Sequence, residues 1–180
     1  MKFIGKIYKP NKTKSKIILE EKLFWYGTGI CILSCIILIL NDETLNFDWL
    51  DTIFKTIGIL SIIVALLGKI SAMFRNEPLN GNFDGLLVIT SDYIKIKEFH
   101  YNLKDILNLE INLVDYYGKM YAKYNYPGPW GSNGIDNKIS FKYQNLKIEK
   151  QFIIENKTDF NKLEKIKLNI KNTLISDVYN

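Results

Sequence analysis

The sequence has little of the chemistry on which most enzymes, metal sites and disulfide-stabilised domains depend. It contains two cysteines and one histidine in 180 residues, and Arg75 is its single arginine. Cys31 and Cys35 both lie inside an apolar run, so they cannot form a disulfide framework for a soluble domain, and they leave the redox compartment open. The scarcity of these residues excludes a disulfide-rich scaffold.

Catalytic motifs are also missing. The sequence has no Gly-x-Ser-x-Gly motif and no His and Cys cluster with metal-ligand spacing, and His100 lies in a short alternating segment where a partly exposed strand residue is expected. Four aspartates lie near predicted turns, where Asp side chains commonly bond the backbone, so no catalytic role is needed to explain them: Asp92, Asp105, Asp115 and Asp136. Asp115 and Asp136 would allow a cation site if their loops shared one end of a barrel. We predict a protein that is not an enzyme and that uses no cofactor and no metal.

The hydrophobicity is concentrated in two runs. Residues 23–40 carry no charge, and a helix of about 18 residues reaches roughly 27 Å, which spans a bilayer core. Residues 56–74 are interrupted only by Lys69, whose long stem can carry its ammonium to the headgroups. Buried core helices are the alternative, but no large soluble domain precedes these runs. We predict two transmembrane helices, the first retained as an anchor because no small-residue cleavage pattern follows it.

Charge around the two runs predicts their orientation. Residues 1–22 contain seven lysines against two acids, whereas the loop 41–55 is acidic up to Lys55 at its end. Because basic segments stay on the cytoplasmic side, we expect an inner (plasma) membrane protein with both termini cytoplasmic. From Phe83 onward lysines and acids nearly balance, so we expect no nucleic-acid partner.

Small residues recur along both runs at spacings of three or four. Such residues make a narrow stripe on one helix face and permit close approach of two membrane helices. The predicted packing residues are Gly27, Cys31, Cys35, Gly58, Ser61, Ala65 and Gly68. The stripe is explained by the two helices packing on each other; a seam between two copies, and hence a homo-oligomer, is the alternative.

After a linker at residues 75–85, the segment 86–180 alternates between apolar and polar residues. This period of two predicts short antiparallel strands joined by tight turns. The expected strands are 86–90, 93–97, one from Phe99, 107–113, one from Met120, one from Lys138 and one from Leu146. From Thr158, a predicted N-cap, the apolar spacing changes to that of an amphipathic helix.

The pieces LLVITSDYIKI, FHYNLKDILNLEI and NKISF, followed by the amphipathic helix, resemble the bacterial pleckstrin-homology-like (PH-like) domains that follow a pair of membrane helices. The resemblance implies a membrane-anchored α+β fold, in which a two-helix transmembrane hairpin precedes a seven-strand antiparallel PH-like barrel or sandwich capped by a C-terminal helix. PH domains that bind phosphoinositides have a basic first hairpin. Here the turn between Thr90 and Tyr93 is Ser-Asp, which argues against inositol-lipid recognition.

The segment YPGPWGSNGID, residues 126–136, is predicted to be a loop, because its prolines cannot donate to a ladder and Asn-Gly favours a turn. A phosphate loop would lead into a helix, whereas this segment leads into a strand. The candidate contact residues are Tyr124, Tyr126, Trp130, Asn133 and Asp136. Three alternatives stay open: a sugar or lipid site, a tryptophan folded over the barrel mouth, and contact with the headgroup zone.

The expected function follows from this architecture. We expect a membrane-anchored binding protein whose cytoplasmic PH-like domain binds a protein segment or lipid near the membrane, with a peptide adding as a strand beside the sheet edge. The alternative is a small accessory subunit that stabilises or regulates a larger membrane complex through its transmembrane helices.

Overall fold

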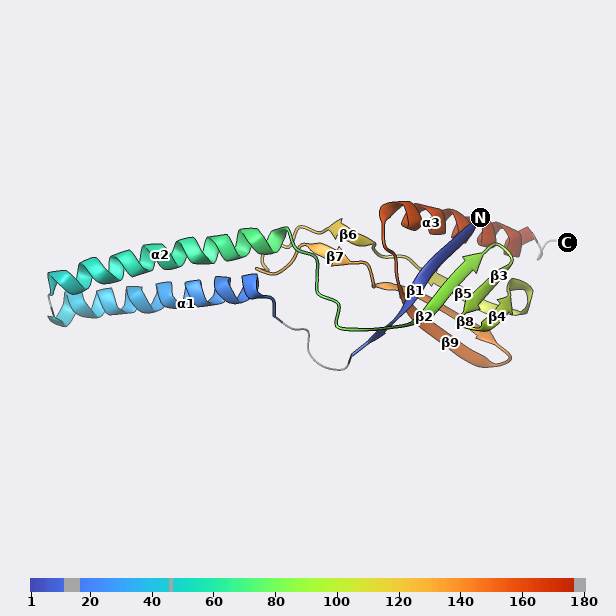
Figure 1. Ribbon diagram of the computed structural model, residues 1–180, viewed down its shortest axis with the longest axis horizontal. Coiled ribbons are helices and arrows are strands. Elements are labelled where there is room, and N and C mark those ends of the chain that lie inside the picture. Colours follow the sequence, from blue (N-terminus) through green and yellow to red (C-terminus); the bar gives the residue numbers. More distant parts are fainter. Residues whose placement is uncertain (12–16, 46, 177–180) are drawn as a thin grey trace. The chain divides into compact units, whose positions relative to one another are not determined.

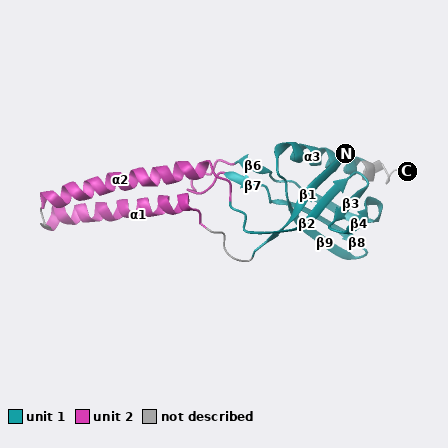
Figure 2. Ribbon diagram, in the orientation of Figure 1, with its two compact units in different colours: residues 1–15, 78–120, 131–180 teal, residues 16–77, 121–130 magenta. Residues whose placement is uncertain are grey.

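A computed structural model describes residues 1–11, 17–45 and 47–176. The chain divides into two compact units (Figure 2). One unit comprises residues 16–77 and 121–130, and we call it the hairpin unit. The other comprises residues 1–15, 78–120 and 131–180, and we call it the sheet domain.

The hairpin unit contains two long antiparallel helices, α1 (Leu19–Leu40) and α2 (Asp48–Met73), joined through a π-helical turn η1 (Asn41–Leu45) (Figure 1). Both candidate spans, Leu19–Thr44 and Asp48–Met73, are long and apolar enough to cross a membrane. Only 11% and 17% of their most apolar windows are buried, whereas a core helix of a soluble protein is mostly buried. Two such helices and an antiparallel sheet in one chain fit a membrane-anchored α+β fold.

Helix α2 begins earlier than the hydrophobic run suggests, at Asp48 instead of Thr56. Asp48 and Asp51 lie in its first turn, where carboxylates interact favourably with the N-terminal end of the helix dipole. The side chain of Asn41 closes the turn, since it donates to the carbonyl of Phe47 and accepts from its amide, both at 3.1 Å. The predicted loop 41–55 is therefore largely helical.

The two helices pack through small buried residues. These are Gly27 and Ser34 on α1, and Ser61, Ala65, Gly68 and Ala72 on α2. A Cβ atom on Gly27 would lie 2.7 Å from the carbonyl oxygen of Ser61, so the backbones approach too closely for a side chain there. Ser34 and Ser61 donate to carbonyls of their own helices at 2.9 and 2.7 Å, so their hydroxyl groups are not left unpaired.

The sheet domain is built on seven antiparallel strands and a C-terminal helix, α3 (Lys157–Ser176) (Figure 1). The strand order is β4-β3-β2-β1-β9-β8-β5. The strands are β1 (Lys2–Pro10), β2 (Gly81–Thr90), β3 (Tyr93–Ile96), β4 (Phe99–Asn102), β5 (Leu107–Asn112), β8 (Asn137–Tyr143) and β9 (Leu146–Ile153), with a 3₁₀ turn η2 (Leu103–Asp105) after β4.

The central strand β1 comes from the lysine-rich N-terminal segment, where no strand was predicted. It pairs with β2, with Lys2 opposite Thr90, and with β9, with Lys6 opposite Ile153. Phe3 and Ile7 are buried while Lys2 and Lys6 are exposed, so the segment alternates as a half-buried strand does. Its lysines favour a cytoplasmic flanking segment in the sequence, and this charge hides the strand pattern.

The helical hairpin is therefore an insertion between two paired strands. Pro10 at the end of β1 pairs with Gly81 at the start of β2. Beyond this pair the amide of Asn11 donates to the carbonyl of Asn80 at 2.9 Å. The chain leaves and re-enters the sheet domain at neighbouring points.

Two expectations about the sheet were wrong. The predicted strand from Met120 is absent: β6 (Tyr117–Met120) pairs with β7 (Gly131–Asn133) in a separate two-stranded sheet, and residues 121–130 form a loop. The main sheet is also not a closed barrel, because closure requires the two end strands to pair, and β4 and β5 form no ladder within the described residues.

The core of the sheet domain lies where α3 covers the inner face of the sheet. Phe3, Phe141 and Phe152 from the strands are buried together with Leu163 and Ile166 from α3. The N-cap of α3 is Asn156 instead of Thr158, since the Asn156 side chain accepts from the amide of Asp159 at 2.8 Å. The amphipathic pattern of α3 is thus used to close one face of the sheet.

Candidate functional site

The first part of the predicted contact loop, with Tyr124, Tyr126 and Trp130, belongs to the hairpin unit. We call residues 121–130 the aromatic loop (Figure 2). The ribbon β6–β7 ends at the pair Met120 and Gly131, and the amide of Tyr121 then donates to the carbonyl of Trp130 at 2.8 Å. This bond joins the first and last residues of the loop and so restricts its conformation.

The aromatic loop contacts the end of the hairpin where α1 begins and α2 has ended. Lys123 Nζ pairs with Glu77 Oε1, just after α2. The Tyr126 hydroxyl donates to Glu21 Oε2, in the first turn of α1, at 3.3 Å. One bond joins the loop to α1 and the other joins it to the segment that follows α2, so the loop connects the two sides of the hairpin.

The acid next to Glu21 in the sequence has a different partner. Arg75 Nε donates to Glu20 Oε1 at 2.9 Å, and this bond links the first turn of α1 to the residues that follow α2. The base of the hairpin therefore carries charges of both signs that are paired with one another. Partly exposed pairs of this kind contribute about 0–1 kcal/mol each, so they add little to the stability of the hairpin unit.

The environment of Tyr126 keeps its phenol protonated. Burial raises the pKa of Tyr126, and the negative carboxylate of Glu21 raises this pKa further. Both effects disfavour the phenolate. The hydroxyl therefore remains a hydrogen-bond donor to Glu21 throughout the neutral range.

The exposed side of the loop is aromatic. The Tyr124 side chain is 74% exposed and meets the Trp130 ring edge-on at 5.7 Å between centroids. The Lys123 ammonium lies 6.0 Å from the centre of the Tyr126 ring. Pro127, Gly128 and Pro129 are buried behind these rings. The indole Nε1 of Trp130 is buried and has no acceptor among the described residues.

Asn133 and Asp136, the other two predicted contact residues, lie in the sheet domain and serve the turn before β8. The buried side chain of Asn133 accepts from the amide of Ile135 at 3.3 Å. The amide of Asp136 donates to Asp115 Oδ1 at 3.3 Å, so these two acids meet through a backbone group. No cluster of three or more His, Cys, Asp or Glu suited to a metal ion occurs within residues 1–11, 17–45 and 47–176.

A buried polar network around Asp115 was not predicted. The Asp115 carboxylate accepts from the Ser132 hydroxyl and, at 3.2 Å, from Asn137 Nδ2. Asn137 Oδ1 accepts from the amides of Val114 and Asp115 at 2.9 and 3.2 Å. Since buried polar groups need partners, this network fixes the chain between β5 and β6 against the start of β8. In the sequence the polar residues from Ser132 to Asn137 indicate a loop, and they do not show that its side chains are buried and bonded to Asp115.

The remaining predicted residues are distributed as follows. His100 lies on β4 and is exposed, with its ring stacked on Tyr93 at 4.2 Å. Cys31 is partly buried, Cys35 is exposed, and both are free thiols. Gly58 lies opposite Ser34, and a Cβ atom on it would be 3.7 Å from that of Ser34.

The outer face of the sheet carries lysines paired with acids. Lys97 lies 2.6 Å from Asp84, and its ammonium lowers the pKa of that carboxyl group. Lys147 and Lys138 lie 3.3 and 4.0 Å from Glu149. A hollow of about 370 Å³ near Lys9 and Lys138 is also lined by Asp84 and Glu149. An anionic ligand at Lys97, Lys138 or Lys147 would compete with these carboxylates.

The end strands of the sheet carry exposed apolar side chains. Phe99 on β4 is 66% exposed and Leu107 on β5 is 65% exposed. Tyr101 on β4 packs edge-on against Phe141 and Tyr143 on β8, with ring centroids 5.2 and 5.1 Å apart. Strand β5 pairs with β8 on one side only among the described residues, with a bulge between Leu107 and Glu110.

Comparison of the chain with protein-family models, curated proteins and solved structures gave no match. The functional conclusion consequently depends on the geometry described above.

Proposed function

We propose that this chain is a membrane-anchored binding protein, in which the helical hairpin holds a PH-like domain beside the bilayer and the edge of its sheet takes up a protein segment. The PH-like assignment is supported by the strand order. Strands β1 to β4 form one antiparallel meander and β5, β8 and β9 form another. The two meanders join through β1 and β9, and a helix follows the last strand.

Strand pairing also supports the proposed topology. Because β1 precedes α1 and pairs with β2 after α2, both connections must lie on one side of the membrane that the hairpin crosses. The lysine-rich residues before α1 and the acidic turn η1 then assign that side to the cytoplasm by the positive-inside rule. The sheet domain is accordingly cytoplasmic.

The observation that carries the binding proposal is the open edge of β5. An unpaired edge is a template for another strand, and soluble proteins usually protect it with lysine, proline or a bulge. Strand β5 has no lysine or proline, and its bulge lies at the Leu107 end. A peptide can add beside Glu110–Asn112 and cover Leu107 with an apolar side chain.

A protein segment is favoured over an anionic lipid headgroup by the charges of the sheet domain. Lys97 already has a carboxylate partner, and Glu149 lies beside both Lys138 and Lys147. The connection between β1 and β2, the first hairpin of the sheet, contains the helical hairpin, and the turn between β2 and β3 is Ser91-Asp92, which carries an acid. Recognition through backbone pairing needs no basic cluster.

The experiment uses a photo-crosslinking amino acid at position 107, with position 168 on the exposed side of α3 as the control, in native membranes. Leu168 is 60% exposed and matches Leu107 in size and exposure. Protein adducts from position 107 that are absent from position 168, and that persist when α1 and α2 are replaced by an unrelated transmembrane hairpin, support the proposal. Adducts that disappear with the native helices favour the accessory-subunit function instead.

A further inference from the structure

We propose that the aromatic loop, residues 121–130, lies in the headgroup region of the bilayer and binds lipid there, so that the protein has a membrane contact in addition to its two spans. The inference rests on the proposed membrane anchoring. Its occupant is the phospholipid surface that surrounds the hairpin, and its contact residues are Tyr124 and Tyr126.

The depth of the loop follows from its bond to α1. The Tyr126 hydroxyl donates to Glu21, and the uncharged run begins two residues later at Leu23. At 1.5 Å per residue, Glu21 lies about 3 Å along the helix axis from that run. A group bonded to Glu21 therefore lies at the boundary between the hydrocarbon core and the headgroups.

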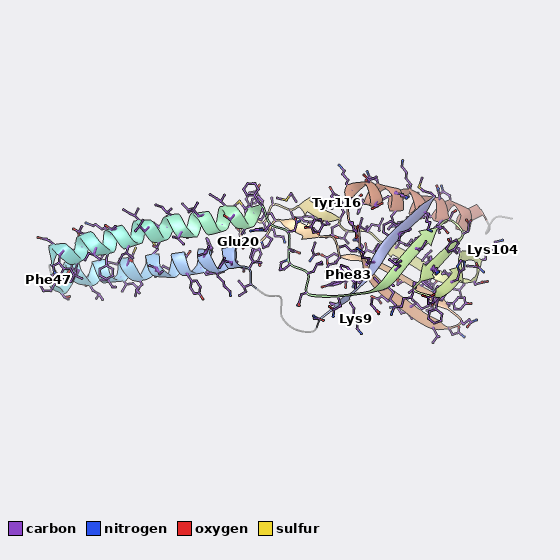
Figure 3. All side chains as sticks on the ribbon, in the orientation of Figure 1. Lys9, Glu20, Phe47, Phe83, Lys104 and Tyr116 are labelled. Carbon is purple, nitrogen blue, oxygen red and sulfur yellow. The ribbon has the colours of Figure 1, made fainter. Side chains whose placement is uncertain are left out.

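The length of the hairpin is consistent with this boundary. From Glu21 to Asn41 a helix rises roughly 30 Å, which equals the thickness of a typical hydrocarbon core. Exposed aromatic residues lie near both limits: Trp25 and Tyr26 in α1, and Phe47 and Trp49 at the far turn. Glu20 and Phe47 mark the two ends in Figure 3. Tryptophan and tyrosine are enriched at these depths because their rings are amphipathic.

The exposed surface of the loop has the same chemistry. Tyr124 is 74% exposed and Tyr126 is 43% exposed, and in the first half of α1 Trp25 and Tyr26 are 55% and 67% exposed. The charged side chain of the loop, Lys123, is paired with Glu77, and the nearby Arg75 is paired with Glu20. The loop therefore contacts lipid through its rings, with little preference for anionic headgroups.

The test measures the depth of single tryptophans in the full-length protein in phosphatidylcholine vesicles. Tyr124→Trp is made in a background of Trp25→Phe, Trp49→Phe and Trp130→Phe. Quenchers are lipids brominated near the headgroup, lipids brominated near the chain end, and aqueous iodide. We expect stronger quenching by the shallow bromolipid than by the deep one, and several-fold weaker quenching by iodide than for Phe99→Trp in the same background.

Two further variants separate the outcomes. A protein that keeps only Trp130 preserves the native loop and should show the same shallow lipid quenching, which guards against distortion by the substitutions. A protein that keeps only Trp25 reports on the span. If Trp25 is quenched by lipid while position 124 and Trp130 respond to iodide alone, the loop inference is wrong and the anchoring stands. If Trp25 is not quenched by lipid either, both are wrong.

The lipid preference is measured in the same samples. Replacing part of the phosphatidylcholine with anionic phosphatidylglycerol should leave the quenching pattern at position 124 unchanged, because Lys123 and Arg75 are paired with carboxylates. A several-fold increase in lipid quenching that salt abolishes would contradict contact through the rings and indicate an electrostatic contact.

Discussion

At the scale of single residues, the base of the hairpin depends on which polar atoms have partners. The Tyr126 hydroxyl has an acceptor in Glu21, whereas the indole N–H of Trp130 has none among the described residues. A donor buried without an acceptor costs about 1–3 kcal/mol, so the buried indole N–H of Trp130 lowers the stability of the hairpin unit. The edge-on contact between the Trp130 and Tyr124 rings offsets part of this cost.

Tyr126→Phe should lower the stability of the hairpin unit by about 1 kcal/mol, because it removes a hydrogen bond to a carboxylate. Tyr124→Phe is the matched control, since that side chain is mostly exposed, and it should change stability little. Thermal unfolding in detergent micelles measures both. Equal effects of the two substitutions would show that the bond to Glu21 is not formed in solution.

The same pair has a defined pH dependence. Since the folded protein raises the pKa of Tyr126, the stabilisation is fully present below the unfolded value of about 10 and is lost as pH rises through the higher folded value. The stability difference between the parent protein and Tyr126→Phe should therefore disappear above that pH.

At the scale of elements, the close approach of α1 and α2 is set by glycine on one helix face. Gly27→Ala places a Cβ atom 2.7 Å from a carbonyl oxygen of α2, whereas Gly29→Ala places it in open space. Both substitutions raise helix propensity equally, so their difference reports packing alone. We expect Gly27→Ala to destabilise the hairpin by about 1–3 kcal/mol and Gly29→Ala to leave it unchanged or more stable, measured by thermal unfolding in micelles.

Strand β1 provides a second matched pair. Phe3 is 1% exposed and meets Phe152 edge-on at 5.9 Å, while the adjacent Ile4 is 52% exposed. Phe3→Ala should destabilise the sheet domain by about 3–5 kcal/mol, because a buried aromatic ring leaves a cavity. Ile4→Ala should cost much less. Hydrogen exchange of β2 and β9 amides measures the effect on the strands that β1 joins, and similar exchange in both variants would exclude β1 from the sheet in solution.

At the scale of the whole molecule, the hairpin is inserted between paired strands, and this has consequences for topology. In a background of Cys31→Ser and Cys35→Ser, a membrane-impermeant maleimide added to intact cells should label Glu43→Cys in the turn η1. It should not label Ser91→Cys in the sheet domain until the cells are lysed. Labelling of both sites in intact cells would contradict a cytoplasmic sheet domain.

The insertion also explains which parts of the fold could be predicted. Residues 23–40 and 56–74 are continuous apolar runs, and α3 has a helical apolar period, so each is recognised without knowing its partner. Strand β1 has the correct alternation but also seven lysines around it, and its partners β2 and β9 lie far away in the sequence. The segment from Met120 looked equally alternating, yet β6 ends at Met120 and the residues after it form a loop that contacts the start of α1.

The sequence by itself determined the two apolar helices, most strands of the sheet and the amphipathic C-terminal helix, because their periods of hydrophobicity are local properties of the chain. Only the tertiary structure decided that the N-terminal segment is the central strand, that the sheet stays open between β4 and β5, and that Tyr126 meets Glu21. These features depend on contacts between residues distant in sequence, and no local pattern specifies which distant residues will meet.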